Sequence, residues 1–440
     1  MATILNRHGR RQLILMGLLI LLVLLEWFAT QKGLLSRDYA EIWIGIYGLS
    51  LVYLLRRGFQ EFYAPDVILM SAYLLLLGIG SVLYAYIRGV QYWGYSTNLF
   101  GIGYIALWIG TIVPRVRLIP VRIGRRFEQP DTLRMRTEFL CLILFAGIAV
   151  VLLFMVSGIP ILSGNVNEAK LQFFSGKGYL SIFYRGLPII SAAYCYYALT
   201  HGSPKLRLQS HVLASIVVFV LLLTGYRGTM LIFCATYISL FSFLAGWRPR
   251  PTILIVAGCL AVTFLGFVGA YRRHNLSVAG AITELGIVVT ARPAISDNIM
   301  RHFGPSNYYE GSRYFDDLAK LLPGSQTGAN VDLKYQLFAN AANMPELAGI
   351  TPGLPAESFM NFGPWWIPLS LFLVGYASNL AFAAMKSAPT VIRSLFYFTL
   401  VFNLAGAVQS GIATKVIHFV FIWFWIAVIA IFFRWKLKWI

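Results

Sequence analysis

Charged residues are scarce in this chain, and acidic ones are the scarcest. Only 12% of the 440 residues are charged, and 17 Asp and Glu stand against 36 Lys and Arg. Soluble domains carry about 25% charged residues, whereas 58% of this chain is hydrophobic and its mean hydropathy is +0.70. A soluble enzyme and a disordered chain are therefore both excluded. The composition predicts an all-α polytopic membrane protein.

Cysteine and histidine are also rare, which excludes a disulfide scaffold and gives no sign of a metal site. The chain has four Cys and six His. Each cysteine lies inside an apolar run, with no CxxC spacing and no histidine at ligand spacing. We interpret all four as small apolar residues. The sequence also lacks a repeat of fixed period, and its two halves do not look like copies, which disfavours the usual transporter architecture.

Long apolar runs recur along the whole chain. A bilayer core requires roughly 17–25 apolar residues per helix, and this criterion predicts about twelve transmembrane helices. They cover residues 13–29, 39–55, 66–87, 99–113, 138–157, 180–200, 210–224, 229–246, 252–270, 365–385, 394–411 and 416–433. The first run lacks an A-x-A cleavage site, so we expect an uncleaved anchor rather than a signal peptide.

The basic residues predict the orientation of these spans. With the N-terminus inside, the cytoplasmic segments hold 21 of the 36 Lys and Arg, and the short outer loops hold 8. Cytoplasmic loops of membrane proteins carry the excess of Lys and Arg. We therefore expect both termini in the cytoplasm. The topology accounts for most of the net charge of +19, so no nucleic acid partner is expected.

One outer connection is far longer than the others. Residues 271–364 separate the ninth and tenth spans, which divides the chain into spans 1–9 (1–270), this large outer loop and spans 10–12 (365–440). The loop is rich in Tyr, Phe and Leu, so we expect it to fold as helices, including 312–322 and 332–340. Long loops in compact proteins are usually functional. We expect a functional site in the cavity beneath it.

Basic residues at the outer surface suggest an anionic ligand. Arg272 and Arg273 lie at the outer end of the ninth span, although basic residues prefer the cytoplasmic side. Arg292 follows in the outer loop. Arg227 lies between glycines in the turn joining spans 7 and 8. Guanidinium groups bind phosphate bidentately, so a lipid-linked pyrophosphate would explain these positions. Contact with lipid headgroups or snorkelling to the interface would explain them too.

The last span also begins with polar groups on its outer side. Lys415 and His418 could line the floor of the cavity there. A lysine at the end of a transmembrane helix more often snorkels to the interface, and we prefer that interpretation for Lys415.

Several features together resemble a known family. They are the number of spans, the Arg in a Gly-flanked turn that opens a span, and one large outer loop late in the chain with Pro-Gly at 323–324. The run Thr-Pro-Gly-Leu-Pro-Ala-Glu-Ser-Phe-Met-Asn-Phe-Gly at 351–363 completes the pattern. Over roughly residues 140–430 the chain resembles the oligosaccharide repeat-unit polymerases of the O-antigen and enterobacterial common antigen (Wzy) type.

This resemblance implies a C-type glycosyltransferase-like fold and a polymerase reaction without a metal or other cofactor. The substrates would be undecaprenyl-pyrophosphate-linked oligosaccharides, joined at the periplasmic face to make O-antigen or another lipopolysaccharide or exopolysaccharide glycan. Such polymerases usually work with a chain-length-regulating co-polymerase, and membrane lipids surround them.

The reaction needs cations for the pyrophosphate, a base for the acceptor hydroxyl and contacts to the sugars. Arg227, Arg272, Arg273 and Arg292 are the predicted cations. The candidate bases are Glu357 and Asp297. Glu357 could instead have a structural role, in which its negative charge interacts with the positive N-terminal end of its own helix. Asp297 could likewise form an ion pair with Arg301, four residues on. The candidate sugar or cavity contacts are His274, His302, Arg301, Tyr314 and Asn361.

Two other functions remain open. An O-antigen ligase would use the same donor but transfer the glycan to lipid A–core, with a histidine such as His274 or His302 as a key group. A lipid-linked oligosaccharide flippase would be a transporter rather than an enzyme. The Thr-Pro…Glu…Asn-Phe-Gly run favours the polymerase over the ligase, and the unrelated halves and large loop disfavour the flippase.

Overall fold

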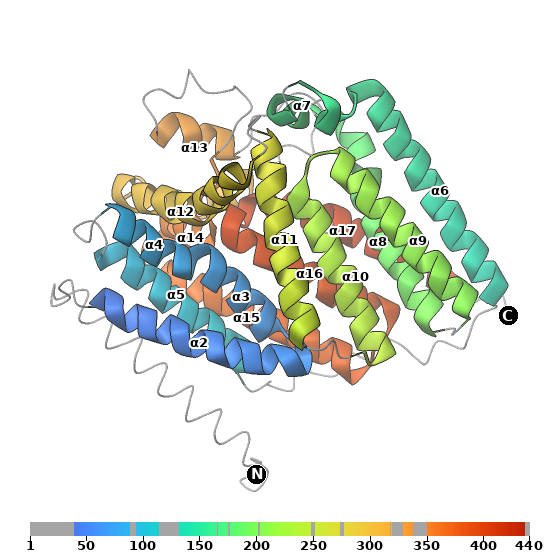
Figure 1. The fold of residues 1–440 in the computed structure, drawn as a ribbon, viewed down its shortest axis with the longest axis horizontal. Coiled ribbons are helices and arrows are strands. Elements are labelled where there is room, and N and C mark those ends of the chain that lie inside the picture. Colours follow the sequence, from blue (N-terminus) through green and yellow to red (C-terminus); the bar gives the residue numbers. More distant parts are fainter. Residues whose placement is uncertain are drawn as a thin grey trace, which may run out of the picture.

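The apolar runs of the sequence form helices that pack side by side (Figure 1). The computed structural model describes residues 39–88, 94–113, 132–164, 166–174, 177–200, 203–247, 251–272, 277–316, 318, 329–337 and 350–435. Within these ranges the chain is helical or in turns and has no strand. In a bilayer a helix satisfies its own backbone hydrogen bonds, which is why long apolar segments adopt it.

The helices follow the predicted spans closely. The first half contains α2 (Tyr39–Glu61), α3 (Pro65–Tyr73), the π-helix η1 (Leu74–Gly78), α4 (Ile79–Arg88), α5 (Gly94–Ile112), α6 (Thr132–Ser157), η3 (Pro160–Leu162), α7 (Val166–Gln172) and α8 (Gly178–Thr200). The second half contains α9 (Pro204–Leu223), α10 (Arg227–Ala245), α11 (Pro251–Arg272), α12 (Val278–His302), η4 (Ser312–Tyr314), α13 (Ala329–Leu337), α14 (Leu354–Phe362), α15 (Trp366–Ser387), α16 (Val391–Ser410) and α17 (Ala413–Trp435).

Eight helices among the described residues are long and apolar enough to cross a membrane. Seven of them fall on predicted spans, and the eighth is α12. Two shorter apolar helices, within α5 and α11, also fall on predicted spans. The predicted span at 13–29 lies outside the described residues. The chain is therefore a multi-pass, all-helical membrane protein, as its composition predicted.

The helix α16 lies between two groups of helices. On one side it packs on α3 and α15, and on the other on α8, α10 and α17. The closest packing joins α5 to α15, where a Cβ added at Gly110 would lie 2.3 Å from the carbonyl oxygen of Phe372. Small residues allow such close approach of helices in a membrane. The two groups are thus joined through one central helix.

Four helices gather at one end of the bundle, which we call the covered end. They are α7, α12, α13 and α14; Figure 1 shows α7 and α13 along its upper edge, with α12 and then α14 below α13. The last three of these come from the predicted loop, 271–364. The 25-residue helix α12 was not predicted there, because Glu284, Arg292 and Asp297 dilute its apolar pattern. It packs on α11 and on α4.

The start of another predicted helix in this loop is wrong. Of the predicted helix 312–322 the structure describes residues 312–316 and 318, and these form the 3-10 turn η4 and further 3-10 and turn residues rather than an α-helix. The reason is that the preceding backbone is held by α14: Tyr309 N donates to Met360 O at 2.9 Å and Glu310 N to Asn361 O at 3.0 Å. The helix predicted at 332–340 does form, as α13, starting three residues earlier and described as far as Leu337.

Candidate functional site

The helix α14 occupies the centre of the covered end. It packs against α12, α15 and α16, and eight of its nine residues are buried. Gly353, with φ of +80°, precedes it, and Pro355 lies in its first turn. Proline there costs no hydrogen bond, because the first amides of a helix have no internal partner. The Thr-Pro…Asn-Phe-Gly run therefore forms a buried helix that carries Glu357 into the protein.

Glu357 caps a helix that is distant in sequence. Its carboxylate is 1% exposed and accepts hydrogen bonds from the backbone N–H groups of Ile412 and Ala413, the latter at 2.9 Å. These amides lie at the start of α17, where helix N–H groups lack internal partners and the helix dipole is positive. Gly411, with φ of +83°, makes the turn, and a Cβ added there would lie 2.8 Å from the Glu357 carboxylate. Glu357 thus holds the start of α17 in place.

Lys415 lies in the first turn of α17 and points into the protein. It is only partly exposed, and its Nζ lies 3.2 Å from where a Cβ at Gly406 of α16 would be. The same Cβ would lie 3.5 Å from Ile232 of α10. The side chain therefore reaches toward the junction of α16 and α10. The prediction that Lys415 snorkels to the interface is wrong.

Arg185, on α8, is a second cation beside Lys415. It is close enough for its charge to act on that of Lys415. Its guanidinium carbon lies 5.5 Å from the ring centre of Phe421 and 6.0 Å from that of Phe174, and its Nε is buried without a hydrogen-bond partner. Two like charges in a poorly solvated place repel each other and are costly unless an anion joins them.

A third cation, Arg292 on α12, is held without an acid. Its Nη1 donates to the side-chain and backbone oxygens of Thr351, the backbone bond being 3.2 Å long. Two residues on, Gly353 approaches the last turn of α16, since a Cβ there would lie 3.2 Å from Val408 O. Arg292 therefore approaches the α16 end from the α12 side. Among the described residues, neither Arg185 nor Lys415 forms an ion pair, and we call these two the cation cluster. Arg292 forms no ion pair there either, but no contact joins it to the other two.

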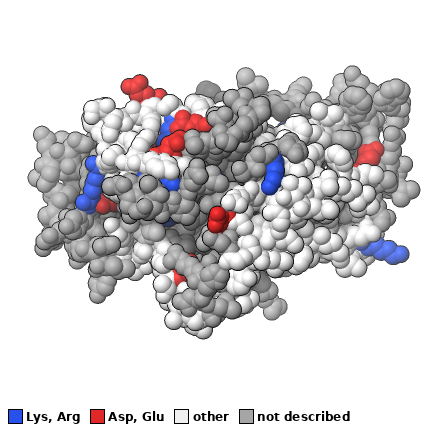
Figure 2. Space-filling view, turned by 90° about the horizontal axis from the view of Figure 1, so that it is seen from above, with Lys and Arg blue, Asp and Glu red and all other residues white. Residues whose placement is uncertain are grey.

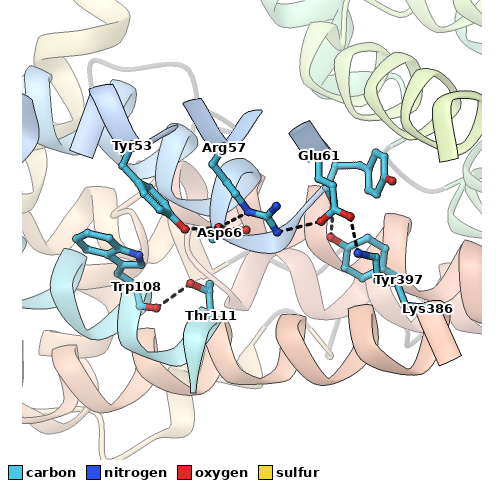
Figure 3. Close-up of polar contacts among 9 residues, drawn as sticks. Tyr53, Arg57, Glu61, Asp66, Trp108, Thr111, Lys386 and Tyr397 are labelled. Carbon is cyan, nitrogen blue, oxygen red and sulfur yellow. Dashed lines mark hydrogen bonds and ion pairs between the residues drawn. The ribbon is translucent and has the colours of Figure 1, made fainter. Parts of the chain in front are cut away.

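The opposite arrangement is found among the cations that join α2, α3 and α15 (Figure 3). There Arg57 pairs with Glu61 at 2.9 Å and with Asp66 at 3.4 Å, and Lys386 also pairs with Glu61. Tyr53 donates to Asp66 at 2.7 Å. In that network every cation has a carboxylate. The cation cluster differs in having none among the described residues.

Two further cations lie at the covered end, and each has a partner. Arg313 is 1% exposed and lies 3.9 Å from Asp316 and over the ring of Tyr309, while Lys334 is 0% exposed and lies over the ring of Tyr335. The elements that carry them, η4 and α13, both pack on α17. Figure 2 views the molecule from above, and the described part of that face is mostly uncharged, with a few scattered groups of Lys, Arg, Asp and Glu.

The predicted acid–base residues are placed differently from one another. Asp297 accepts from Ser96 Oγ at 2.5 Å and pairs with Arg301 at 2.8 Å, as the spacing of four residues suggested. It links α12 to α5, whereas Glu357 links α14 to α17. The two candidate bases therefore serve different helix junctions.

The predicted sugar contacts are spread over the covered end and do not form one group. Tyr314 Oη accepts from Trp366 Nε1 at 3.0 Å, and burial raises the pKa of Tyr314 to about 12, so it is a neutral hydroxyl at neutral pH. Asn361 is buried and its Oδ1 has no partner, while its Nδ2 donates to Glu357 O at 2.9 Å. His302 is exposed at the end of α12. Arg273 and His274 lie outside the described residues.

Two predicted phosphate ligands are described only by their backbone. Arg227 is the first residue of α10 and Arg272 the last of α11, both within the described helices. The turn before Arg227 adjoins Arg185, since Tyr184 Oη and Thr224 Oγ1 are 3.0 Å apart and the ring of Tyr226 contacts that of Phe174. The Gly-flanked turn is therefore next to the cation cluster.

Sequence reasoning missed Arg185. The sequence does contain a signal for it, because Arg185 lies inside the apolar run 180–200. An arginine within a transmembrane helix is rare and is therefore a candidate functional residue.

No protein-family model, curated protein or solved structure matches this chain.

Proposed function

We propose that this protein is a polysaccharide polymerase, a membrane glycosyltransferase that joins undecaprenyl-pyrophosphate-linked oligosaccharide repeat units. One observation carries the proposal: the cation cluster at the covered end has no carboxylate partner among the described residues. Unpaired cations in a membrane protein are costly and are retained where they bind an anion. A pyrophosphate next to the hydrocarbon layer is an anion of suitable charge and location.

The reaction needs one bond to form and one to break. An acceptor sugar hydroxyl attacks the anomeric carbon of the donor glycan, and the bond from that carbon to the pyrophosphate oxygen breaks. The pyrophosphate leaves on its lipid with the bonding electron pair, and the hydroxyl proton goes to a base. Arg185 and Lys415 would stabilise the negative charge that develops on the leaving group, a contribution that typically changes a rate by 10²–10³ per donor.

Glu357 would position Lys415 by fixing the start of the helix that carries it. Its carboxylate holds the first amides of α17, and Lys415 follows two residues after Ala413 on the same turn. We keep Glu357 as the first candidate for the base, with Asp297 second. The buried Asn361 and Tyr314 beside it would contribute to the sugar side of the cavity.

The membrane orientation belongs to the same proposal. The excess of basic residues in the segments opposite the covered end favours both termini in the cytoplasm. The covered end would then face the periplasm of a Gram-negative inner membrane, where lipid-linked repeat units are presented after flipping. A chain-length-regulating co-polymerase would be the protein partner there.

The test is polymerisation by the purified protein in lipid nanodiscs. Supplied with an undecaprenyl-pyrophosphate-linked repeat unit, the wild-type protein should convert it into a ladder of glycans. Arg185→Ala and Lys415→Ala should each lower the rate by about 10²-fold or more. The matched control is Lys386→Ala, which removes a paired cation and should leave the ladder intact. A normal ladder from both site variants would refute the proposal, and transfer only to lipid A–core would identify a ligase instead.

A further inference from the structure

The helix α11 is attached to the bundle mainly through the first part of α12. A Cβ added at Gly266 of α11 would lie 3.0 Å from Ala281 O and 3.2 Å from the side chain of Leu285, so the two helices are in close contact near the connection between them. Among the described elements, α11 packs extensively only on α12. The described side chains of α11 between residues 256 and 264 are all exposed. We call α11 together with residues 278–292 of α12 the hairpin.

The second part of α12, in contrast, is fixed to the rest of the protein by hydrogen bonds. Ser296 Oγ donates to Pro352 O at 2.8 Å, in the segment just before α14. Asp297 accepts from Ser96 Oγ of α5 at 2.5 Å. In Figure 1 α12 extends from the upper end of α11 toward α4 and α14, on both of which it packs. The two parts of one helix therefore belong to different packing units.

Pro293 lies between these two parts. A proline within a helix has no N–H to donate to the carbonyl four residues earlier, and its ring crowds that carbonyl. The carbonyl of Val289 thus loses its usual donor, and Gly80 of α4 approaches it: a Cβ added at Gly80 would lie 2.3 Å from Val289 O. Gly80 follows the π-helix η1, which also packs on α12. Helices bend at prolines and at π-helical turns, and here the two kinds of irregularity meet.

Pro188 of α8 is also inside a helix but is held on all sides. The helix α8 packs on α6, α9, α10, α16 and α17. Trp425 of α17 donates to Ile182 O at 2.9 Å, and its ring lies against Gly186, where an added Cβ would be 2.2 Å from it. Bending at Pro188 would displace these neighbours. A proline acts as a hinge only where the helix on one side of it can move, and this condition is met at Pro293.

The tip of the hairpin has one weak contact with the opposite side of the bundle. Tyr271 Oη donates to Ile161 O of η3 over 3.4 Å at an exposed position, which is long for a hydroxyl hydrogen bond. The 15 residues from 278 to 292 measure about 22 Å, so a bend of about 20° at Pro293 would move the start of α12 by roughly 7–8 Å. Residues 246–250, which connect α10 to α11, can span up to roughly 17 Å and would permit this movement.

We propose that the hairpin moves as one body about Pro293 and that this motion breaks and remakes the contact between Tyr271 and Ile161. The structure shows the closed arrangement, in which the contact is made. In the open arrangement the tip of the hairpin lies away from η3. The motion is that of a lateral gate, which opens the covered end sideways between these two elements. Few positions absorb the change, as is usual for hinges.

Distances between spin labels, measured by double electron–electron resonance, test the gate. The labels are attached to pairs of introduced cysteines in the full-length protein in nanodiscs, with the four native cysteines replaced by alanine. The hinge pair joins Ile282 of α12 to Leu144 of α6, the hairpin pair joins Ile282 to Val256 of α11, and the body pair joins Leu144 to Leu373 of α15. All four positions are exposed. Each label of the hinge pair also occurs in a control pair, so broadening that comes from the label itself is recognised.

We expect a broad or two-peaked distance distribution for the hinge pair, at least about twice as wide as the single peaks of the hairpin and body pairs. Pro293→Ala supplies an N–H for Val289 O and should reduce the hinge pair to one peak. The matched control, Pro188→Ala, should leave the hinge pair unchanged, and Tyr271→Phe should shift it toward longer distances.

Two results would overturn the gate. One is a single hinge-pair peak in the wild type that is as narrow as the body-pair peak. The other is a hinge-pair distribution that Pro293→Ala leaves unaltered while size-exclusion elution shows the variant to be folded. None of these distances depends on glycan synthesis, so the gate and the polymerase can be refuted independently of each other.

Discussion

Removing the charge of Lys415 should stabilise the protein while it abolishes function. Lys415 is partly buried beside Arg185 and has no carboxylate within ion-pair distance among the described residues. The variant Lys415→Met keeps a side chain of similar length and removes the charge. In the absence of ligand, desolvation of the Lys415 ammonium and its repulsion by Arg185 raise the free energy of the folded state. Methionine carries no charge, so neither effect applies to it.

The expected size of this effect follows from comparable substitutions. Replacing buried ionic groups by apolar ones of similar volume is often neutral or stabilises by 1–4 kcal/mol. Because Lys415 keeps some exposure, we expect the lower part of that range, about 1–2 kcal/mol. In thermal unfolding of the ligand-free protein in nanodiscs this corresponds to a rise of roughly 1–2 °C, because the entropy of unfolding grows with chain length. The same preparation should form no glycan ladder.

The matched control is Lys386→Met in the paired network. Lys386 is bonded to Glu61, which also pairs with Arg57. Its loss removes a partly exposed ion pair, so we expect a decrease in stability of about 0–1 kcal/mol and a normal ladder. The two lysine variants should therefore shift the unfolding temperature in opposite directions. A fall of several degrees for Lys415→Met would refute the reasoning, since it would mean that Lys415 has a stabilising partner within the protein.

Three further predictions concern the cap, the base and the topology. Gly411→Ala should destabilise the protein by roughly 1–3 kcal/mol, measured by thermal unfolding, because φ is +83° there and the added Cβ would displace the Glu357 carboxylate; an unchanged unfolding temperature would contradict the cap. Glu357→Gln should lower the polymerisation rate by about 10²–10⁴ and Asp297→Asn should leave it near normal, at matched protein levels; the reverse pattern would give the base role to Asp297. A cysteine introduced at Ser312 should react with an impermeant maleimide from outside and one at Gln129 should not, whereas reverse labelling would invert the proposed orientation.

The amino-acid sequence by itself determined the membrane character and the positions of the helices. Apolar run length is a local property, and a bilayer leaves helices as the only way to satisfy the backbone within such runs. For this reason each span predicted from residue 39 onward coincides with a helix. The position of the unusual segment, 271–364, was equally evident as an interruption of that pattern. The helix α12 was missed because its charged residues break the local apolar signal.

Only the tertiary structure decided which charges are paired. Arg57 and Arg185 both lie in helices rich in apolar residues, yet Arg57 has two carboxylates beside it and Arg185 has none among the described residues. Likewise Glu357 meets the amides of residues 412 and 413, some 55 positions along the chain. Ion pairs and caps between distant segments depend on how helices pack, and hydropathy along the chain carries no record of that packing. The local pattern therefore located the covered end, and the packing of α8, α14, α16 and α17 selected the residues within it.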